Sequence, residues 1–239
     1  MPNELAGKFA VVTGGSRGIG FAIVEALASR GCKVVFTFRN NESSHAAAAK
    51  LKAANLSAIP IQCDVRDEQA IRRLFEVLGE KFGQIDFLIN NAGIFGPAVA
   101  VDQVPTEGWR EALDTNLTGT FLCTKYAVPL MQRGAIIVNN LSVAATQAFP
   151  NSAAYAASKQ GALGLTNGMR EDLRSRGIRV IALMPGATET EIWNQFWPDA
   201  PREKMMQAQD VAEAVVAALL MPERTSMDEI RIHPAVGRL

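Results

Sequence analysis

The sequence predicts an α/β fold: a doubly wound, parallel, seven-stranded sheet with helices on both faces. Two observations support this prediction. Short apolar runs rich in Val, Ile and Phe alternate along the chain with longer stretches of helical periodicity, as successive β-α units require. Several of the helical stretches also end at a glycine, a residue that commonly closes a helix.

The predicted strands are short apolar runs, each bounded by polar or turn-forming residues. They cover Phe9–Thr13, Val34–Arg39, Ala58–Gln62, Phe87–Asn90, Ala135–Asn140, Arg179–Met184 and Glu229–His233. Because each run is followed by a helical stretch, we expect the strands to lie parallel in one sheet.

Helices are expected in the gaps between the strands. Those that end at a glycine signal are Ile19–Arg30 before Gly31, Asp67–Phe82 before Gly83, and Ala153–Arg174 before Gly177. A long helix is predicted over Thr106–Met131, and His45–Ala54, with its four successive alanines, is a good helix former. Ala187–Pro201, rich in Trp, Phe and Pro, follows a strand and is expected to be an irregular, ligand-gating loop.

Length and composition predict one domain that spans residues 1–239. With 239 residues, of which 48% are hydrophobic, the chain can bury one sizeable core. Its 24 basic and 24 acidic residues cancel, so no net field attracts nucleic acid or an anionic membrane. No apolar run approaches the ~18 residues of a membrane span. We therefore expect a cytoplasmic protein with neither nucleic acid nor a membrane as partner.

The three cysteines, Cys32, Cys63 and Cys123, are widely spaced and lie among apolar neighbours. An odd number of such residues is typical of reduced core thiols and not of a disulfide framework. The sequence assigns no residue to a metal.

A glycine-rich turn, Thr13–Gly20, follows the first predicted strand and precedes a helix. Gly14, Gly18 and Gly20 let the backbone approach a pyrophosphate closely, while the N–H groups and dipole at the helix start favour negative charge. Phe21 stands where a phosphate-loop NTPase has its lysine, so that class is disfavoured. The turn predicts a dinucleotide-binding sheet of the Rossmann type.

Two other interpretations of this turn stay open. Gly14, Ser16 and Gly18 also match the nucleophile elbow of a serine hydrolase, which lies between a strand and a helix as this turn does. That mechanism needs an oxyanion loop and a base, yet few residues precede the strand, and only His45 and His233 could serve as the base. The turn could also be a tight glycine turn that binds no ligand.

The second predicted strand indicates which dinucleotide binds. NAD-binding folds commonly end this strand with an acid that accepts a hydrogen bond from the adenosine ribose. Phe38 takes that place, Arg39 follows it, and Arg17 lies in the glycine-rich turn. Two guanidinium groups suit a 2′-phosphate, so we predict NADP(H); the alternative is that either arginine is a solvated surface residue. Asp64, after the third strand, is expected to accept a hydrogen bond from the adenine amine.

Four polar residues suggest proton chemistry. Tyr155 and Lys159 are four residues apart in a helical segment, so they share a face, and a lysine ammonium can lower the pKa of a tyrosine. Taken alone, this pair fits an ordinary amphipathic helix equally well. Ser142, at the end of the fifth strand, can lie beside Tyr155. Asn116 is a poor residue for the middle of a helix, so its side chain is expected to make a specific contact.

With these motifs in order, the chain resembles the short-chain dehydrogenase/reductases, in the single-domain subgroup that includes the 3-oxoacyl-acyl-carrier-protein reductases. The resemblance extends from Thr13 to about Leu220. Its landmarks are the Thr-Gly-x-x-x-Gly-x-Gly loop at Thr13–Gly20, Asp64–Val65, Asn-Asn-Ala-Gly at Asn90–Gly93, the Ser142, Tyr155 and Lys159 spacing, and Pro185–Gly186 with Thr188.

The resemblance implies that Asn116, Ser142, Tyr155 and Lys159 form a catalytic tetrad. Ser142 and Tyr155 would bind the carbonyl oxygen, and Tyr155 would protonate the alkoxide formed when hydride arrives from the nicotinamide. Lys159 would bind the nicotinamide ribose, and Asn116 would hold a water of the proton relay. The expected cofactor contacts are Thr13, Gly14, Ser16, Arg17, Gly18, Ile19, Gly20, Arg39, Asp64, Val65, Asn91, Ala92, Gly93, Tyr155, Lys159, Pro185, Gly186 and Thr188.

The substrate is predicted only by class, a carbonyl or secondary alcohol that includes the 3-oxoacyl type. Leu141 precedes Ser142 where many members have a small polar residue, and the chain lacks the Asp-Gly-Gly ending of many acyl-carrier-protein reductases. Trp193, Phe196 and Trp197 are expected to cover the substrate, the alternative being core or interface packing. His233 is expected to be an edge or interface residue.

As in the family that it resembles, we expect a homotetramer or homodimer, built on the Thr106–Met131 and Ala153–Arg174 helices. The remaining alternative is a non-catalytic module that senses NADPH without turning it over.

Overall fold

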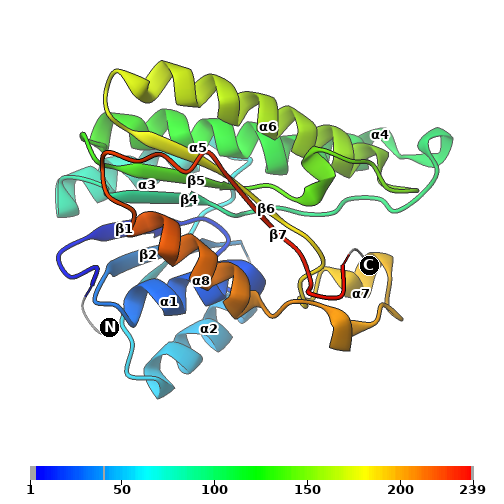
Figure 1. Ribbon diagram of the computed structural model, residues 1–239, viewed down its shortest axis with the longest axis horizontal. Coiled ribbons are helices and arrows are strands. Elements are labelled where there is room, and N and C mark those ends of the chain that lie inside the picture. The colour runs from blue at the N-terminus through cyan, green and yellow to red at the C-terminus, as the bar shows by residue number, and fades with distance from the viewer. Residues whose placement is uncertain (1–3, 40, 238–239) are drawn as a thin grey trace.

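A seven-stranded parallel sheet forms the centre of the molecule, as Figure 1 shows for the computed structural model. The structure describes residues 4–39 and 41–237, and the side chains of all of these except 41, 42, 195 and 196. The strands are β1 Phe9–Val12, β2 Lys33–Phe38, β3 Ala58–Gln62, β4 Phe87–Asn90, β5 Ile136–Asn140, β6 Arg179–Pro185 and β7 Glu229–Ile232. Their order across the sheet is β3-β2-β1-β4-β5-β6-β7. The predicted sheet is confirmed, and every strand end lies within one residue of its predicted position.

Helices cover both faces of the sheet, which also confirms the prediction (Figure 1). They are α1 Gly18–Ala28, α2 Asn41–Ala53, α3 Glu68–Phe82, α4 Thr106–Leu113, α5 Gly119–Ala127, α6 Ala153–Arg174, α7 Trp193–Phe196 and α8 Ala208–Leu219. Side chains alternate between the faces along each strand. Ala10 and Val12 pack with α1 and α8, whereas Val11 packs with α3, α5 and α6. The strands are therefore apolar on both faces, as in other buried parallel sheets.

Local backbone contacts set the start of α3 and the end of α1. The Asp67 carboxylate accepts hydrogen bonds from the backbone N–H groups of Gln69 and Ala70, so α3 begins one residue later than predicted. The predicted bounds of α6 are confirmed. The first helix ends at Ala28 and not at Arg30, because the chain turns there to enter β2.

The long helix predicted over Thr106–Met131 is interrupted, so that prediction was wrong in part. Between α4 and α5 the chain forms one π-helical turn, Asp114–Thr118, and a short 3₁₀ turn, Val128–Leu130, follows α5. Asn116 lies within the π turn, where its side chain bonds to backbone outside the helix. Such turns are frequent at functional sites, and this one directs Asn116 toward Ile94 in the loop after β4.

The order of the strands creates a topological switch between β1 and β4. From β1 the chain builds the sheet outward through β2 and β3, then returns to place β4 on the other side of β1. In such sheets ligands bind at the carboxyl ends of the strands, at the switch point. The loops after β1 and β4 meet there: Gly14 has a φ of 63°, and a Cβ built on it would lie 2.9 Å from Ala92 Cα.

The cysteines lie in the core, as predicted. Cys32, Cys63 and Cys123 are buried and form no disulfide. Burial raises the pKa of the Cys32 thiol to about 12 and that of Cys63 to about 11, so both are protonated and inert at neutral pH. Among the residues that the structure describes, no helix has the length and apolar character needed to cross a membrane.

Gly20 tests the packing at the switch point. A Cβ built on Gly20 would lie 2.3 Å from both Asn91 Nδ2 and the Gly14 carbonyl oxygen. Gly20→Ala should therefore lower the free energy of unfolding by about 1–3 kcal/mol, as overpacking does. Gly168→Ala, in α6, is the control, because nothing lies within 4 Å of its added Cβ. It should stabilise the protein by about 0.5–1 kcal/mol in denaturant titrations. Equal effects of the two substitutions would contradict this packing.

Candidate active site

The loop after β1 is fixed by hydrogen bonds to its neighbours. The Gly14 N–H donates to Thr37 Oγ1 (3.2 Å) and the Gly15 N–H to the Thr37 carbonyl oxygen (2.9 Å), which tie the loop to β2. The Thr13 hydroxyl oxygen accepts from the backbone N–H groups of Asn91 (2.9 Å) and Ala92 (3.0 Å), which tie it to the end of β4. Arg17 precedes α1 without capping it through its side chain. The first N–H groups of α1 therefore favour an anion.

The Asn91 side chain joins three strand ends. Its Nδ2 group donates to the carbonyl oxygens of Thr13 and Gly14, both at 3.0 Å. Its Oδ1 atom accepts from Asn140 Nδ2 at 2.8 Å. The ends of β1, β4 and β5 are thus held in one arrangement.

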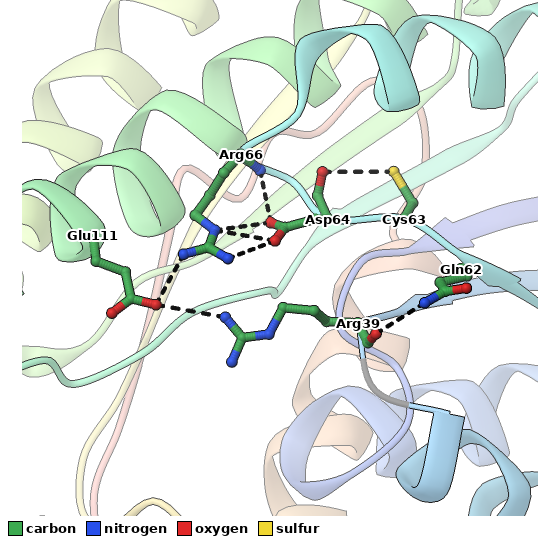
Figure 2. Close-up of polar contacts among 6 residues, drawn as sticks. All are labelled: Arg39, Gln62, Cys63, Asp64, Arg66 and Glu111. Atoms are coloured by element: carbon green, nitrogen blue, oxygen red, sulfur yellow. Dashed lines mark hydrogen bonds and ion pairs between the residues drawn. The ribbon is translucent and has the colours of Figure 1, made fainter.

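The two arginines of the predicted 2′-phosphate site are each paired with a carboxylate. Arg17 donates to Glu191 at 2.9 Å. Arg39, directly after β2, lies 3.5 Å from Glu111 of α4, as Figure 2 shows. Phe38 packs against the core from the end of β2. No acid stands at the position of Phe38, as the sequence indicated. The guanidinium groups of Arg17 and Arg39 are both exposed at the surface.

Asp64, predicted to meet adenine, is bound by a neighbour that the sequence analysis did not identify. Arg66 donates to both oxygens of Asp64, at 2.6–3.1 Å, and to Glu111 at 2.9 Å (Figure 2). The hydrogen bond from Arg66 is the main reason that the pKa of Asp64 is lowered. The spacing of Asp64 and Arg66 could have suggested their pairing, whereas Glu111 lies 45 residues further on.

Asn116 makes the specific contact that its position in a helix suggested. Its Oδ1 atom accepts from the Ile94 N–H, and its Nδ2 group donates to the Ile94 carbonyl oxygen, both at 2.9 Å. Nδ2 also donates to Ser158 Oγ at 2.8 Å, and Ser158 donates to the Tyr155 carbonyl oxygen at 2.7 Å. Asn116 thereby connects the loop after β4 to α6.

Ser142, Tyr155 and Lys159 gather at the end of β5. Ser142 lies two residues after β5, forms a side-chain hydrogen bond with Tyr155, and accepts from the Ala144 N–H at 3.1 Å. Lys159 Nζ donates to the Asn140 carbonyl oxygen at 3.0 Å and lies 5.7 Å from the centre of the Tyr155 ring. Phe95 stacks on that ring with their centres 4.7 Å apart.

The pKa of Tyr155 differs from the sequence-based expectation. Burial raises it, and the hydrogen bond from Ser142 only partly offsets this effect. The expected lowering by Lys159 is absent, because the pKa of Lys159 is about 8 and this group has lost its charge before Tyr155 would ionise. Burial lowers the pKa of Lys159 to about 8. Both groups are therefore harder to charge than they are in water.

Small residues leave space beside these groups. A Cβ built on Gly93 would lie 3.1 Å from Asn116 Oδ1 and 3.5 Å from Lys159 Nζ. Gly93 itself is exposed whereas Asn116 and Lys159 are buried, so the glycine places no side chain between these groups and the surface. Val65, another of the expected cofactor contacts, packs against Gly119 of α5.

The segment after β6 covers this edge of the sheet. Buried Thr188 donates to the Gly186 carbonyl oxygen at 3.0 Å, and Trp193 Nε1 donates to the Thr188 carbonyl oxygen at 2.7 Å. Trp193 and Trp197 lie with their rings 6.1 Å apart, and Trp197 is 42% exposed. The side chain of Phe196, the third predicted lid aromatic, lies outside the described residues. The loop predicted to be irregular contains the short helix α7, which ends where the Trp197 N–H donates to the Trp193 carbonyl oxygen.

Ser16 and His233 are two of the residues that the serine hydrolase interpretation would use. Ser16 lies with its hydroxyl 3.0 Å from that of Ser43 at the start of α2. His233 is exposed just after β7, the edge strand, and its Nδ1 atom lies 3.1 Å from a Cβ built on Gly186.

Comparison with known proteins agrees with this geometry. The chain matches the family model described as short chain dehydrogenase over residues 8–201. It is 38% identical over 186 residues to a 3beta-hydroxysteroid dehydrogenase of Mediterraneibacter gnavus, covering 77% of this chain and 67% of that protein. It is also 38% identical to a 3-oxoacyl-acyl-carrier-protein reductase of Synechocystis, covering 79% of this chain and 77% of that protein.

A solved structure provides a comparison over nearly the whole chain. A short chain dehydrogenase from Burkholderia cenocepacia, in complex with NADP, superposes with a TM-score of 0.86 at 35% identity. The match covers 96% of this chain and 98% of the other.

The buried charge of Lys159 predicts an unusual dependence of stability on pH. Its pKa falls from 10.5 to about 8 on folding, so between these values only the unfolded chain holds the proton. Stability should therefore rise with pH from about 8 to about 10.5. Lys159→Met removes the buried charge and should be more stable than wild type by about 1–2 kcal/mol at pH 7.

Urea titrations between pH 7 and 10 measure this difference. The advantage of Lys159→Met should shrink as the pH passes about 8. Lys52→Met, at an exposed lysine of α2, is the control because it changes no buried charge. A constant difference between Lys159→Met and wild type across this pH range would contradict the shifted pKa.

Proposed function

The chain belongs to the short-chain dehydrogenase family, and we propose that it is an NADP(H)-dependent oxidoreductase that reduces a carbonyl group to a secondary alcohol. The family supports the reaction class. The observation that carries the proposal is the cluster at the end of β5, where Ser142 bonds to Tyr155 and Lys159 lies beside the same ring. These groups can bind a carbonyl oxygen and deliver a proton to it.

The residues around the switch point fit a dinucleotide. Gly14 and Gly20 bring the loop close to Ala92 and Asn91, and the uncapped start of α1 favours a pyrophosphate. Arg17 and Arg39 suit a 2′-phosphate, and the Burkholderia relative was solved with NADP. When bound, the reduced nicotinamide supplies the hydride.

The proton chemistry follows from the surroundings of Tyr155. Because burial raises its pKa, Tyr155 is a neutral phenol at neutral pH and can donate its proton to a developing alkoxide. Ser142 would share the substrate oxygen with it and stabilise the negative charge. Lys159 and Asn116, linked to Tyr155 through α6, would return a proton to the site from solvent.

We infer that the aromatic residues of the segment after β6 select the substrate. We propose that Trp193 and Trp197 form an apolar wall of the substrate site, so that hydrophobic ketones are favoured. The relatives suggest a panel that includes a 3-oxosteroid and a 3-oxoacyl thioester. We further propose a homotetramer or homodimer through the exposed faces of α4, α5 and α6.

The two alternatives predict other results. A module that only senses NADPH would bind it without oxidising it in the presence of any ketone. A serine hydrolase would use Ser16, but the hydroxyl of Ser16 pairs with Ser43 and not with a base. The family of the chain does not favour either alternative.

Substitution of the proposed proton donor tests the function. Tyr155→Phe removes only the hydroxyl, so kcat/KM for NADPH-dependent ketone reduction should fall by at least about 100-fold. Tyr126→Phe is the matched control, because Tyr126 is the chain's other tyrosine and its hydroxyl binds Glu68 on the surface. Absorbance of NADPH at steady state measures both variants. Equal turnover by Tyr155→Phe and wild type would refute the proposed role.

A further inference from the structure

Both arginines that the proposed function assigns to the 2′-phosphate are already engaged by carboxylates. We propose that Glu111 and Glu191 are specificity-determining residues that occupy Arg39 and Arg17 and that the 2′-phosphate of NADP(H) displaces. This inference rests on the proposed function for the identity of the cofactor. It adds two acidic residues, from α4 and from the segment after β6, to a site whose proposed parts are the glycine loop and the end of β2.

The two arginines follow two segments that are bonded to each other. The glycine loop is bonded to β2 through the Gly15 N–H and the Thr37 carbonyl oxygen at 2.9 Å. Ser16 of the loop also lies 3.0 Å from Ser43, at the start of the helix that follows β2. Arg17 directly follows Ser16, and Arg39 lies two residues after Thr37. An anion bound at the junction of the loop and β2 can therefore reach both guanidinium groups.

Glu111 can release Arg39 without becoming unpaired. It lies 2.9 Å from Arg66 and 3.5 Å from Arg39, so its contact with Arg66 is the closer one (Figure 2). Arg66 is held in turn by its bonds to Asp64. The group of Arg39, Arg66, Asp64 and Glu111 contains two cations and two anions, so it is neutral as it stands. An arriving phosphate takes the cation that is held least closely.

Glu191 links the displacement of a carboxylate by the phosphate to the segment after β6. A Cβ built on Gly18 would lie 3.2 Å from Thr190 Cγ2, so this segment rests on the glycine loop. The Arg17–Glu191 ion pair, at 2.9 Å, adds a charged link at the same point. A 2′-phosphate that binds Arg17 competes with this link, whereas a cofactor with a free 2′-hydroxyl leaves it intact.

Both carboxylates therefore oppose the binding of a phosphate in two ways. Each occupies a guanidinium group, and each places a negative charge near the incoming one. Because the four side chains are 44–65% exposed, solvent and salt screen these effects, and each carboxylate should change affinity by only a few-fold.

The test measures the dissociation constants of NADPH and NADH by nicotinamide fluorescence at low ionic strength. Glu111→Gln and Glu191→Gln keep the shape of the side chain and remove its charge. Each should bind NADPH about two- to fivefold more tightly than wild type, with NADH nearly unchanged. The double variant should show roughly the product of the two effects, and added salt should reduce all of them.

Two controls use neighbouring carboxylates. The first control is Glu107→Gln, because Glu107 lies one turn before Glu111 on α4 and pairs with Arg110. The second is Glu189→Gln, because Glu189 lies two residues before Glu191 and accepts a hydrogen bond from Gln207. Neither should change the preference for NADPH. Thermal unfolding of each variant without cofactor checks that the fold is intact.

The outcomes separate this inference from the proposed function. Equal binding of NADPH and NADH by wild type would contradict the proposed cofactor preference, and this inference with it. A wild-type preference for NADPH that neither substitution strengthens would overturn this inference alone. Weaker binding of NADPH by the variants would also overturn it, because the carboxylates would then be positioning the arginines.

Discussion

The Asn91 side chain is the constraint on which the site depends. Its amide bonds to the carbonyl oxygens of Thr13 and Gly14 and accepts from Asn140, so one side chain fixes the ends of β1, β4 and β5. The glycine loop needs this arrangement to bind a phosphate. Lys159 needs it as well, because its ammonium donates to the backbone of Asn140. The dinucleotide and proton-transfer parts of the site are thus positioned by the same few hydrogen bonds.

The site places ionisable groups where they are costly to charge. Burial lowers the pKa of Lys159, which costs stability at neutral pH, and it raises the pKa of Tyr155, which is a neutral phenol there in both the folded and the unfolded chain. In exchange, a phenol that stays protonated at neutral pH can donate to a substrate oxygen, and a lysine with a pKa of about 8 can exchange protons readily. Local violations of the usual rules for buried residues are expected at functional sites.

The parts of the molecule with local signals could be predicted from the sequence. The strands could be placed because buried parallel strands are short apolar runs, and Asn116 could be singled out because it is unfavourable in a helix. The contacts of Asn116 with Ile94, 22 residues away, were not predictable from spacing. Nor was the π turn that presents it.

The ion pairs between residues far apart in the sequence could not be predicted from the sequence either. Glu111 and Glu191 read as ordinary surface acids, because nothing in the neighbouring sequence indicates that they pair with Arg39 and Arg17. The direction of the Tyr155 pKa was predicted wrongly, since spacing gives the distance to a lysine but not the degree of burial. The catalytic roles of the four clustered residues remain predictions that the geometry supports.

The proposed function requires that hydride passes directly from the nicotinamide to a carbonyl carbon while Tyr155 supplies the proton. The most direct measurement follows isotopes during reduction of a ketone from the panel. With NADPH carrying deuterium at the transferring position of C4, the alcohol should carry deuterium on the carbinol carbon. With unlabelled NADPH in D₂O, that carbon should carry none. Deuterium from the solvent on the carbinol carbon, or no alcohol from any ketone of the panel, would contradict the proposed function.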